Sequence, residues 1–334
     1  MNLVYSMFYY LIRTKTHNNR KWDYKLNPRC SLIILAYNQQ EYIYEGIKAA
    51  FAQLGEPIEI IISDDASSDN TFTIIEQAIA NYSGPNKVIA NRNAKNMGII
   101  AHTNKIVKIA KGEIIIPSYG DDISLPNRTK RILEEFDKYN PLLIHSHAIP
   151  INEKGEQVKS KYEKATFFKT VNPLDISTSL SHYLGASGAW HRKLFDKYGP
   201  IKSELVYDDH ILGFRAALEK RVRLINEPLL YYREGVGISH SMNKNFNKND
   251  YKLNRKKILR QAISVYTDRI EDAFKFGLAH NDPIVTKLDI ALVESISRLS
   301  YHQSKVNLLE FFLKNPKITL NAVLSELLRD LRRR

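Results

Sequence analysis

The sequence contains a single cysteine, Cys30, among its 334 residues. One thiol excludes an internal disulfide and fits a reducing compartment. Because Cys30 lies at the start of an apolar run, we expect it to be buried and to serve packing rather than catalysis.

The chain also lacks the apolar run of ~20 residues that a membrane-spanning helix requires. Residues 3–12 are apolar and aromatic but too short, and no small-residue cleavage site follows them. We therefore expect neither a transmembrane helix nor a secretion signal in the N-terminal segment, residues 1–29. Two interpretations stay open for it: a helix at a membrane interface, or a helix packed on the domain.

Acidic residues are in the minority, with 36 Asp and Glu against 49 Lys and Arg and a formal net charge of +13. Such a surface attracts an anion, which could be nucleic acid, a nucleotide or anionic lipid. The basic residues gather near the two ends of the chain, and these clusters lack the interleaved aromatic residues of a base-stacking surface. A nucleic-acid-binding protein is therefore the weaker alternative.

With 43% apolar and 25% charged residues, the chain is typical of a folded globular protein. Its first half alternates short β-branched runs without polar alternation with helical patterns, which predicts an α/β fold with a mostly parallel sheet covered by helices. The expected strands are 31–36, 58–63, 87–90 and the run ending before Asp121, and the expected helices are 41–53, 72–82 and 100–110, the last capped by Gly112.

Polar residues follow three of these strands. They are Tyr37 and Asn38 after the first, Asp65 after the second, and Asp121 and Asp122 after the fourth. A glycine followed by two acids is compatible with an ordinary turn. Ligands of parallel sheets, however, bind beyond the carboxyl ends of the strands, where these turns converge, and paired carboxylates suit Mg²⁺ or Mn²⁺. We therefore predict a ligand site at this edge.

The pattern after Asp122 is less regular. We expect helices at 128–139 and 207–218, a strand at 142–147, a turn at 152–155, one or two short strands at 221–230, and helices from about residue 243 to the end. His145 and His147 would share a strand face, for which we prefer a structural role. The small-residue segment 185–190 could line a sugar pocket or let backbones pack closely.

These motifs in this order resemble the family 2 glycosyltransferases, a large inverting group with a nucleotide-sugar-binding GT-A fold. The resemblance covers about residues 30–239 and is strongest at 31–38, 60–71, 96–122 and 207–218. It implies a Rossmann-like GT-A domain at 30–240, with a nucleotide-sugar-binding half at 30–122 and an acceptor-side half at 123–240. Residues 241–334 would then form a basic helical C-terminal extension.

The resemblance also implies roles for donor-side residues. Tyr37 would stack against the nucleotide base and Asp65 would accept from a base N–H. The remaining positions that match the nucleotide-sugar site are Asn38, Asn96, Gly98 and Asp121.

By the same resemblance, Asp121 and Asp122 would hold Mn²⁺ or Mg²⁺, and Asp209 would be the general base. Asp208 would assist Asp209 or cap its helix. Many family members carry a histidine shortly after a Tyr-Arg pair, whereas Glu234 follows Arg233 here. Arg233 is our candidate for contacting the diphosphate, and whether His240 replaces the histidine stays open.

We accordingly expect a hexosyltransferase that moves a sugar from a UDP-sugar, with GDP and dTDP donors as alternatives, to a glycan or lipid-linked oligosaccharide. Bacterial O-antigen or capsule biosynthesis is the setting implied by the family. The basic ends indicate a cytoplasmic protein, peripheral on the anionic inner face of the plasma membrane, and a homo-oligomer through the C-terminal helices is a further expectation. An inactive GT-A scaffold is the other alternative.

Overall fold

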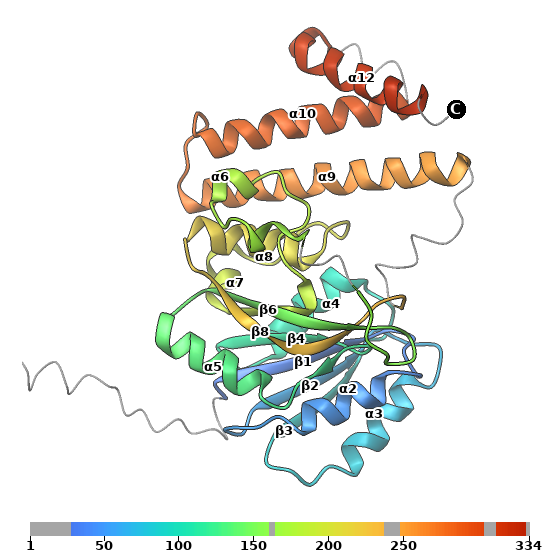
Figure 1. Ribbon diagram of the computed structural model, residues 1–334, viewed down its shortest axis with the longest axis vertical. Helices are drawn as coiled ribbons and strands as arrows, with labels where there is room; N and C mark the ends of the chain where they lie inside the picture. The colour runs from blue at the N-terminus through green and yellow to red at the C-terminus, as the bar shows by residue number, and fades with distance from the viewer. Residues whose placement is uncertain (1–27, 160–163, 237–247, 304–311, 332–334) are drawn as a thin grey trace, which may run out of the picture.

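The computed structural model describes residues 28–159, 164–236, 248–303 and 312–331. It consists of one mixed sheet with helices on both faces, over which further helices are stacked one after another toward the C-terminus (Figure 1). Residues 1–27 of the N-terminal segment, for which the sequence leaves open both an interfacial helix and a helix packed on the domain, lie outside these ranges, as does the position of His240.

The sheet has eight strands in the order β3-β2-β1-β4-β7-β6-β8-β5. Their bounds are β1 Cys30–Ala36, β2 Glu59–Asp64, β3 Lys87–Arg92, β4 Ile114–Tyr119, β5 Ile123–Ser124, β6 Leu143–Ile151, β7 Ala189–His191 and β8 Val222–Arg233. β1 pairs in parallel with β2 and β4, and β2 pairs in parallel with β3. β6 and β8 also pair in parallel, whereas β7 is antiparallel to β4 and β6 and β5 is antiparallel to β8. The sheet is therefore mixed but mostly parallel, as predicted.

The helices alternate with the strands in the first half and follow them in the second. Those around the sheet are α2 Ile43–Phe51, α3 Thr71–Ala80, α4 Ile99–Ile109, α5 Arg128–Tyr139, α6 Pro173–Ile176, α7 Lys193–Tyr198 and α8 Asp208–Leu218, with short 3-10 turns η2 Thr166–Phe168 and η3 Gly185–Ser187. The C-terminal helices are α9 Lys248–Phe276, α10 Pro283–Gln303 and α12 Pro316–Leu331. The predicted helices are confirmed to within a few residues at each end.

β1 lies between β2 and β4. This central position explains why its sequence has no alternation of polar and apolar residues. Every residue of the strand is buried. Leu32 and Ile34 pack in the cluster on one face of the sheet, while Ile33 and Leu35 pack in the cluster on the other. Because successive strand side chains point to opposite faces, a strand covered by helices on both sides must be apolar throughout. The buried Cys30 begins this strand, which confirms its packing role.

Two sequence predictions need correction. Gly112 does not cap the preceding helix α4, which ends at Ile109 with Ala110 as its C-cap. Gly112 instead packs so closely on β1 that an added Cβ would lie 2.4 Å from the Cys30 carbonyl carbon. The segment predicted as one or two short strands is a single strand of 12 residues, β8, that continues through Arg233. Register shifts in its pairing with β6 interrupt the hydrogen-bond ladder, which obscured its length in the sequence.

The C-terminal helices dock on the second half of the sheet domain, beginning with the contact between α9 and α8. Arg215 of α8 donates to Asp272 of α9 at 2.7 Å, and both side chains are 2% exposed. α10 packs on α9, and α12 on α10 (Figure 1). Within the part of the chain that the structure describes, no helix is long and apolar enough to cross a membrane.

Candidate active site

The end of β1 brings two of the predicted loops together. The Asp65 N–H donates to the Ala36 carbonyl at 2.9 Å, and the Gly120 N–H donates to the Leu35 carbonyl at 3.0 Å. Because β2 and β4 flank β1, these two bonds place Asp65 on one side of the strand end and the Gly120 turn on the other. The predicted convergence of these loops at the carboxyl edge of the sheet is thus confirmed.

Tyr37 and Asn38 continue directly from β1. Tyr37 is 43% exposed, an unusual state for an aromatic ring at the end of a fully buried strand. Asn38 adopts a left-handed backbone with φ of 51°. Its N–H donates to Ser67 Oγ at 2.8 Å, and its side-chain oxygen accepts from the Ser68 N–H at 2.9 Å. Asn38 therefore ties the β1 loop to the β2 loop and leaves the Tyr37 ring accessible.

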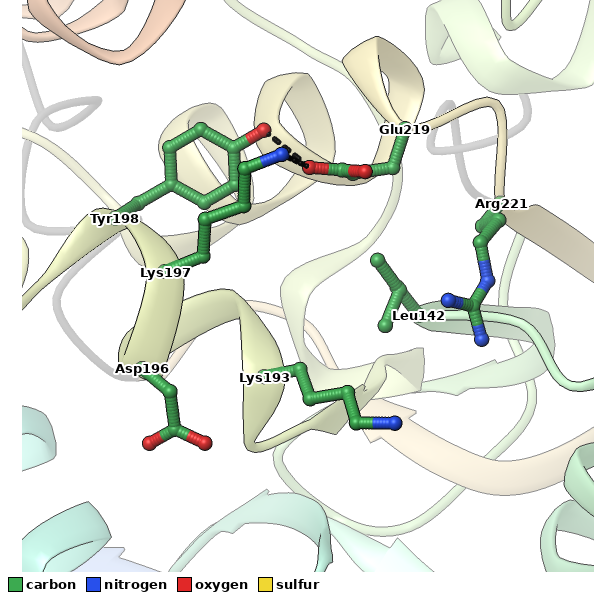
Figure 2. A pocket seen from close by; sticks show the side chains of 7 residues that line it. All are labelled: Leu142, Lys193, Asp196, Lys197, Tyr198, Glu219 and Arg221. Atoms are coloured by element: carbon green, nitrogen blue, oxygen red, sulfur yellow. Dashed lines mark hydrogen bonds and ion pairs between the residues drawn. The ribbon is translucent and has the colours of Figure 1, made fainter. Parts of the chain in front are cut away.

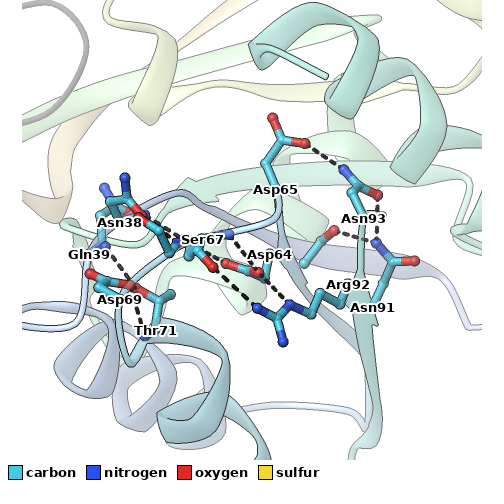
Figure 3. Close-up of polar contacts among 12 residues, drawn as sticks. Asn38, Gln39, Asp64, Asp65, Ser67, Asp69, Thr71, Asn91, Arg92 and Asn93 are labelled. Carbon is cyan, nitrogen blue, oxygen red and sulfur yellow. Dashed lines mark hydrogen bonds and ion pairs between the residues drawn. The ribbon is translucent and has the colours of Figure 1, made fainter. Parts of the chain in front are cut away.

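Asp65 holds the loop before α4. Its carboxylate accepts from Asn93 Nδ2 at 2.7 Å, the Met97 N–H at 2.9 Å and the Gly98 N–H at 3.0 Å. Figure 3 shows the contact with Asn93 and the neighbouring network around Asp64, which binds Ser67 and Arg92. Asp65 is therefore fixed in place at the site edge.

Asn96 and Gly98 form the turn that receives Asp65. Asn96 Oδ1 accepts from the Gly98 N–H at 2.9 Å. Gly98 has φ of 78°, where a side chain would be strained, and it opens α4. Both residues thus shape the loop.

Asp121 and Asp122 lie in the turn after β4 and are both buried, at 8% and 1% exposure. Burial raises the pKa of both carboxyls, and the Asp121 charge raises that of Asp122 further. Asp122 Oδ1 accepts from the Arg233 N–H at 3.1 Å, but Asp122 Oδ2 is buried with no hydrogen-bond partner in the structure. A buried oxygen without a donor is costly, and a divalent cation would satisfy it.

The turn itself needs a glycine. A Cβ on Gly120 would lie 2.2 Å from Gln39 Oε1 and 2.9 Å from Ile43 Cδ1, so α2 packs directly on the turn. Among the described residues, no cluster of three or more His, Cys, Asp or Glu side chains could hold a metal. The two carboxylates fit a cation that shares its other ligands with water and substrate phosphates, as Mg²⁺ and Mn²⁺ commonly do.

Arg233 is buried beneath this turn. Its Nε donates to the Asp121 carbonyl at 3.1 Å, its Nη1 donates to the carbonyls of Asn152 and Glu153, and its Nη2 donates to Glu45 at 2.7 Å. These contacts occupy most of its donors. The structure thus gives Arg233 a role in holding the Asp121–Asp122 turn against β8.

Arg128 lies beside the candidate site and was not singled out from the sequence, which predicted only a helix at 128–139. It is 0% exposed and donates to the carbonyls of Pro117 at 2.8 Å and Ala186 at 2.7 Å. Its charge lowers the pKa of Asp122, against the larger effect of burial. Its position in the first turn of α5 carried no signal that it would point inward.

Asp208 and Asp209 begin α8 and are both buried. Burial, with the Asp209 charge, raises the pKa of Asp208 to about 6, and burial raises the pKa of Asp209 to about 7. The Arg269 charge and the backbone N–H groups of Asp209 and His210 oppose the second shift. Asp209 is therefore poised to exchange a proton near neutral pH.

Tyr119 connects this acid pair to the end of β4. The Tyr119 hydroxyl donates to Asp208 Oδ2 at 2.9 Å, and Tyr119 ends β4, two residues before Asp121. Gly185 lies against the same pair, since a Cβ there would approach Asp208 Oδ1 to 3.5 Å. The segment 185–190 thus lies beside the acids, where it also receives the Arg128 guanidinium through the Ala186 carbonyl.

The two histidines of β6 have no metal-binding arrangement among the residues that the structure describes. His145 is buried against Phe167, Phe168 and Tyr183, and burial lowers its pKa to about 3. His147 Nε2 lies 3.1 Å from Asn226 Oδ1. The preferred structural role is therefore supported.

Two pockets lie beside the predicted site rather than in it. One pocket of about 400 Å³ is lined by residues of α7, by Glu219 after α8, and by Leu142 and Arg221 just before β6 and β8. Figure 2 shows Lys197 and Tyr198 meeting Glu219 there. The other, of about 420 Å³, includes Glu45 and Arg233. Neither of these two pockets is lined by Asp65 or Asp209.

The model of the family described as Glycosyl transferase family 2 matches residues 31–199. The chain belongs to this family. The match includes β1, the three polar loops and η3. The enzyme is thus a glycosyltransferase.

Relatives agree with this assignment. An uncharacterized glycosyltransferase of Haemophilus influenzae is 26% identical over 319 residues, which cover 89% of this chain and 90% of the relative.

Solved structures share the fold. S. aureus TarS 1-349, in complex with UDP-GlcNAc, has a TM-score of 0.58 at 18% identity and covers 88% of this glycosyltransferase and 79% of its own chain. The mannosyltransferase PcManGT from Pyrobaculum calidifontis, in complex with GDP-Man and Mn²⁺, has a TM-score of 0.51 at 14% identity and covers 97% and 93%. The predicted GT-A fold with a C-terminal helical extension is therefore confirmed.

Proposed function

We propose that this family 2 glycosyltransferase transfers a sugar from a nucleotide sugar, with a UDP-sugar favoured, to a hydroxyl of a glycan or lipid-linked acceptor with inversion. One observation carries the proposal: the loops after β1, β2 and β4 meet at one edge, and Tyr119 links that edge to the acids of α8. This arrangement gathers an accessible ring, a metal-competent carboxylate and a carboxylate with a pKa of about 7.

The nucleotide would lie over the ends of β1 and β2. The exposed Tyr37 ring offers a face for base stacking, which contributes about 1–3 kcal/mol per base in comparable sites. A carboxylate has about four acceptor positions. Asp65 uses three of them within its loop, so one is left for a base N–H such as that of uracil.

Asp121 and Asp122 would hold Mn²⁺ or Mg²⁺ between the turn and the donor diphosphate. The unpartnered Oδ2 of Asp122 supports this assignment. When bound, such a cation neutralises charge on the leaving diphosphate. PcManGT is a relative in fold whose structure contains Mn²⁺, which supports the same choice. Arg233 and Arg128 hold the turn from below, so the carboxylates are presented in a fixed geometry.

Asp209 would act as the general base. It removes the proton of the acceptor hydroxyl while that oxygen bonds to the anomeric carbon, and the bond from this carbon to the diphosphate oxygen breaks on the opposite face. The electron pair leaves with the diphosphate, and no covalent intermediate with the enzyme is needed. A base whose pKa lies near the working pH is the most effective for such a transfer.

The C-terminal helices support contact with an anionic membrane, which fits a lipid-linked acceptor in bacterial polysaccharide assembly at the cytoplasmic face. α12 carries a leucine stripe whose members are 42–52% exposed and share one helix face: Leu320, Leu324, Leu327, Leu328 and Leu331. The opposite face is buried through Thr319, Ala322 and Glu326. Lys317 lies in the first turn of α12, and Arg329 lies in the last turn, where it pairs with Glu326. A basic residue near anionic lipid contributes about 1 kcal/mol.

Vesicle sedimentation tests the membrane contact. We expect the protein to bind phosphatidylserine-containing vesicles at low salt and the double variant Leu324→Gln, Leu328→Gln to remain unbound. Equal binding by the variant, or a monomer–dimer change with no vesicle binding, would show that the stripe serves another purpose, such as pairing of two copies.

A donor screen tests the enzymatic proposal. Thermal shift and calorimetry with UDP-, GDP- and dTDP-sugars, with and without Mn²⁺, should identify one donor whose binding requires the metal. Asp122→Asn should bind that donor more weakly at each Mn²⁺ concentration, whereas Asp196→Asn, which changes an exposed acid of α7, should bind like the unmodified protein. Absence of any donor binding or transfer, with Asp122→Asn and Asp209→Asn unchanged, would refute the proposal.

A further inference from the structure

We propose that Arg269 of α9 is a positioning residue of the active site, which holds the first turn of α8 and supplies the buried positive charge that faces Asp209. This inference rests on the proposed role of Asp209 as base. It makes the C-terminal extension a part of the catalytic apparatus, because α9 follows the whole GT-A sheet in the sequence.

The contacts of Arg269 converge on the start of α8 and the segment beside it. Arg269 is 0% exposed. Its Nε and Nη2 donate to the His210 carbonyl at 3.1 and 2.8 Å, and its Nη1 donates to the Ser177 carbonyl at 2.5 Å. Nη2 also lies 3.2 Å from His182 Nε2. One side chain thus fixes the residue that follows Asp209 and the backbone of the segment after α6.

Arg269 differs from the other buried arginine between the same helices. Arg215 forms a direct ion pair with Asp272, whereas the described residues offer Arg269 carbonyls and one imidazole but no salt bridge. Burial lowers the pKa of Arg269 to about 9, opposed by the nearby Tyr266, Asp209 and Asp272, so it remains charged at neutral pH. A buried cation without a paired anion is costly, and ionised Asp209 compensates part of that cost.

Among the described residues near Asp209, Arg269 supplies the positive charge that lowers the Asp209 pKa. Asp208 and His210 come from its own helix, and burial lowers the pKa of His210 to about 4, so this imidazole is neutral at pH 7. The remaining groups are the phenols of Tyr119, Tyr183 and Tyr207. After burial, the Arg269 charge is the largest influence on the pKa of Asp209, and it lowers it.

Removing this charge should therefore reduce the ionised fraction of Asp209 near neutral pH. An opposite charge at short range commonly lowers a carboxyl pKa by about 1–3. The acidic limb of the kcat profile, expected near pH 7 from Asp209, should move upward by about one pH unit in a neutral variant. The kcat at pH 7 should then fall roughly fivefold and recover at higher pH.

Arg269→Gln is the primary variant, because it keeps a donor for the backbone carbonyls but loses the charge, and Arg269→Met is the second. Arg269→Lys retains the charge and should keep the limb within about half a pH unit of its position in the unmodified enzyme. Lys275→Met is the matched control: Lys275 is also a cation of α9 that donates to a carbonyl, that of Tyr198 at 2.6 Å. We expect the limb to stay in place in this control.

Each variant is measured as kcat and donor KM from pH 5.5 to 9.5, with circular dichroism to confirm folding. The expected result is a displaced limb with donor KM unchanged for the neutral variants. A limb that stays in place, or a uniform loss at all pH values, overturns the inference. If both neutral variants fail to fold, Arg269→Lys decides, since a limb that moves by a full pH unit in that variant also overturns the inference. Full activity of Asp209→Asn would instead refute the base assignment on which this rests.

Discussion

Asp65 at the carboxyl edge of the sheet and Asp209 at the start of α8 are both buried, but their surroundings differ. Asp65 accepts hydrogen bonds from Asn93, Met97 and Gly98. Asp209 lies at the start of a helix, with His210 Nε2 3.9 Å from its carboxylate, and burial raises its pKa to about 7. A carboxylate supplied with donors stabilises its loop, whereas one buried with few donors is costly to ionise and available for proton transfer.

The turn that contains Asp121 and Asp122 adds a third case. Asp122 has one oxygen bonded to the Arg233 N–H and another without a partner. It is thus intermediate between the two cases: half of the carboxylate is held by the protein and half is open to a ligand. Under the proposed function, Asp65 would anchor a loop, Asp122 would bind a cation and Asp209 would accept a proton.

The largest expected effect is on turnover in Asp209→Asn. Loss of a general base commonly costs 10²–10⁴-fold, so we expect kcat to fall about a thousandfold while donor affinity stays within twofold. Transfer assays with calorimetry measure both quantities. Asp196→Asn should retain full turnover. A similar fall in kcat in both variants would show that the loss is not specific to Asp209.

Asp122→Asn should weaken metal-dependent donor binding by about a hundredfold, since the amide removes a charge from the cation site. Titration of the donor at several Mn²⁺ concentrations measures the loss. We expect added Mn²⁺ to restore binding partly. Unchanged metal dependence would show that the buried turn serves the fold alone.

Asp65→Asn should lower the free energy of unfolding by about 1–3 kcal/mol, because an amide nitrogen would face N–H donors that the carboxylate now accepts. Urea unfolding at pH 7.5 measures the change. An unaltered stability would mean that the loop of Asn96 and Gly98 does not depend on Asp65.

Asp209→Asn should have the opposite effect to Asp65→Asn and raise the free energy of unfolding by about 1–2 kcal/mol at pH 8. Its pKa rises from 3.8 in the unfolded chain to about 7 on folding, so the ionisation cost is absent below pH 3.8, grows between the two values and is complete above pH 7. Thermal unfolding should show a melting temperature higher by about 2–5 °C at pH 8 and a smaller gain at pH 5. If Asp209→Asn were less stable than the unmodified protein at pH 8, the expected difference between Asp209 and Asp65 would be wrong.

The sequence was sufficient to predict the sheet and the carboxyl edge at which the polar loops meet. A fully apolar strand such as β1 must be covered on both faces, and parallel strands must deliver their following residues to one edge, so Tyr37, Asp65 and Asp121 could be placed together from pattern alone. These are properties of local periodicity and chain direction, which the order of residues contains directly.

Burial of charge could not be predicted in the same way. Arg128, Arg233 and Arg269 look like surface residues in their helices and strand, yet each is nearly fully buried and bound to carbonyls far away in the sequence. Contacts between residues so distant depend on how elements pack, which no local pattern encodes. For the same reason, the raised pKa values of Asp208 and Asp209 are consequences of packing.

The sequence by itself therefore determined the family, the parallel sheet and the acids that meet at its edge, because these follow from strand patterns and motif spacing. Tertiary structure alone decided that Arg233 supports the Asp121–Asp122 turn and that α9 reaches the start of α8 through Arg269. The physical reason is that a charge removed from water must find its partners in three dimensions, and those partners belong to other elements of the fold.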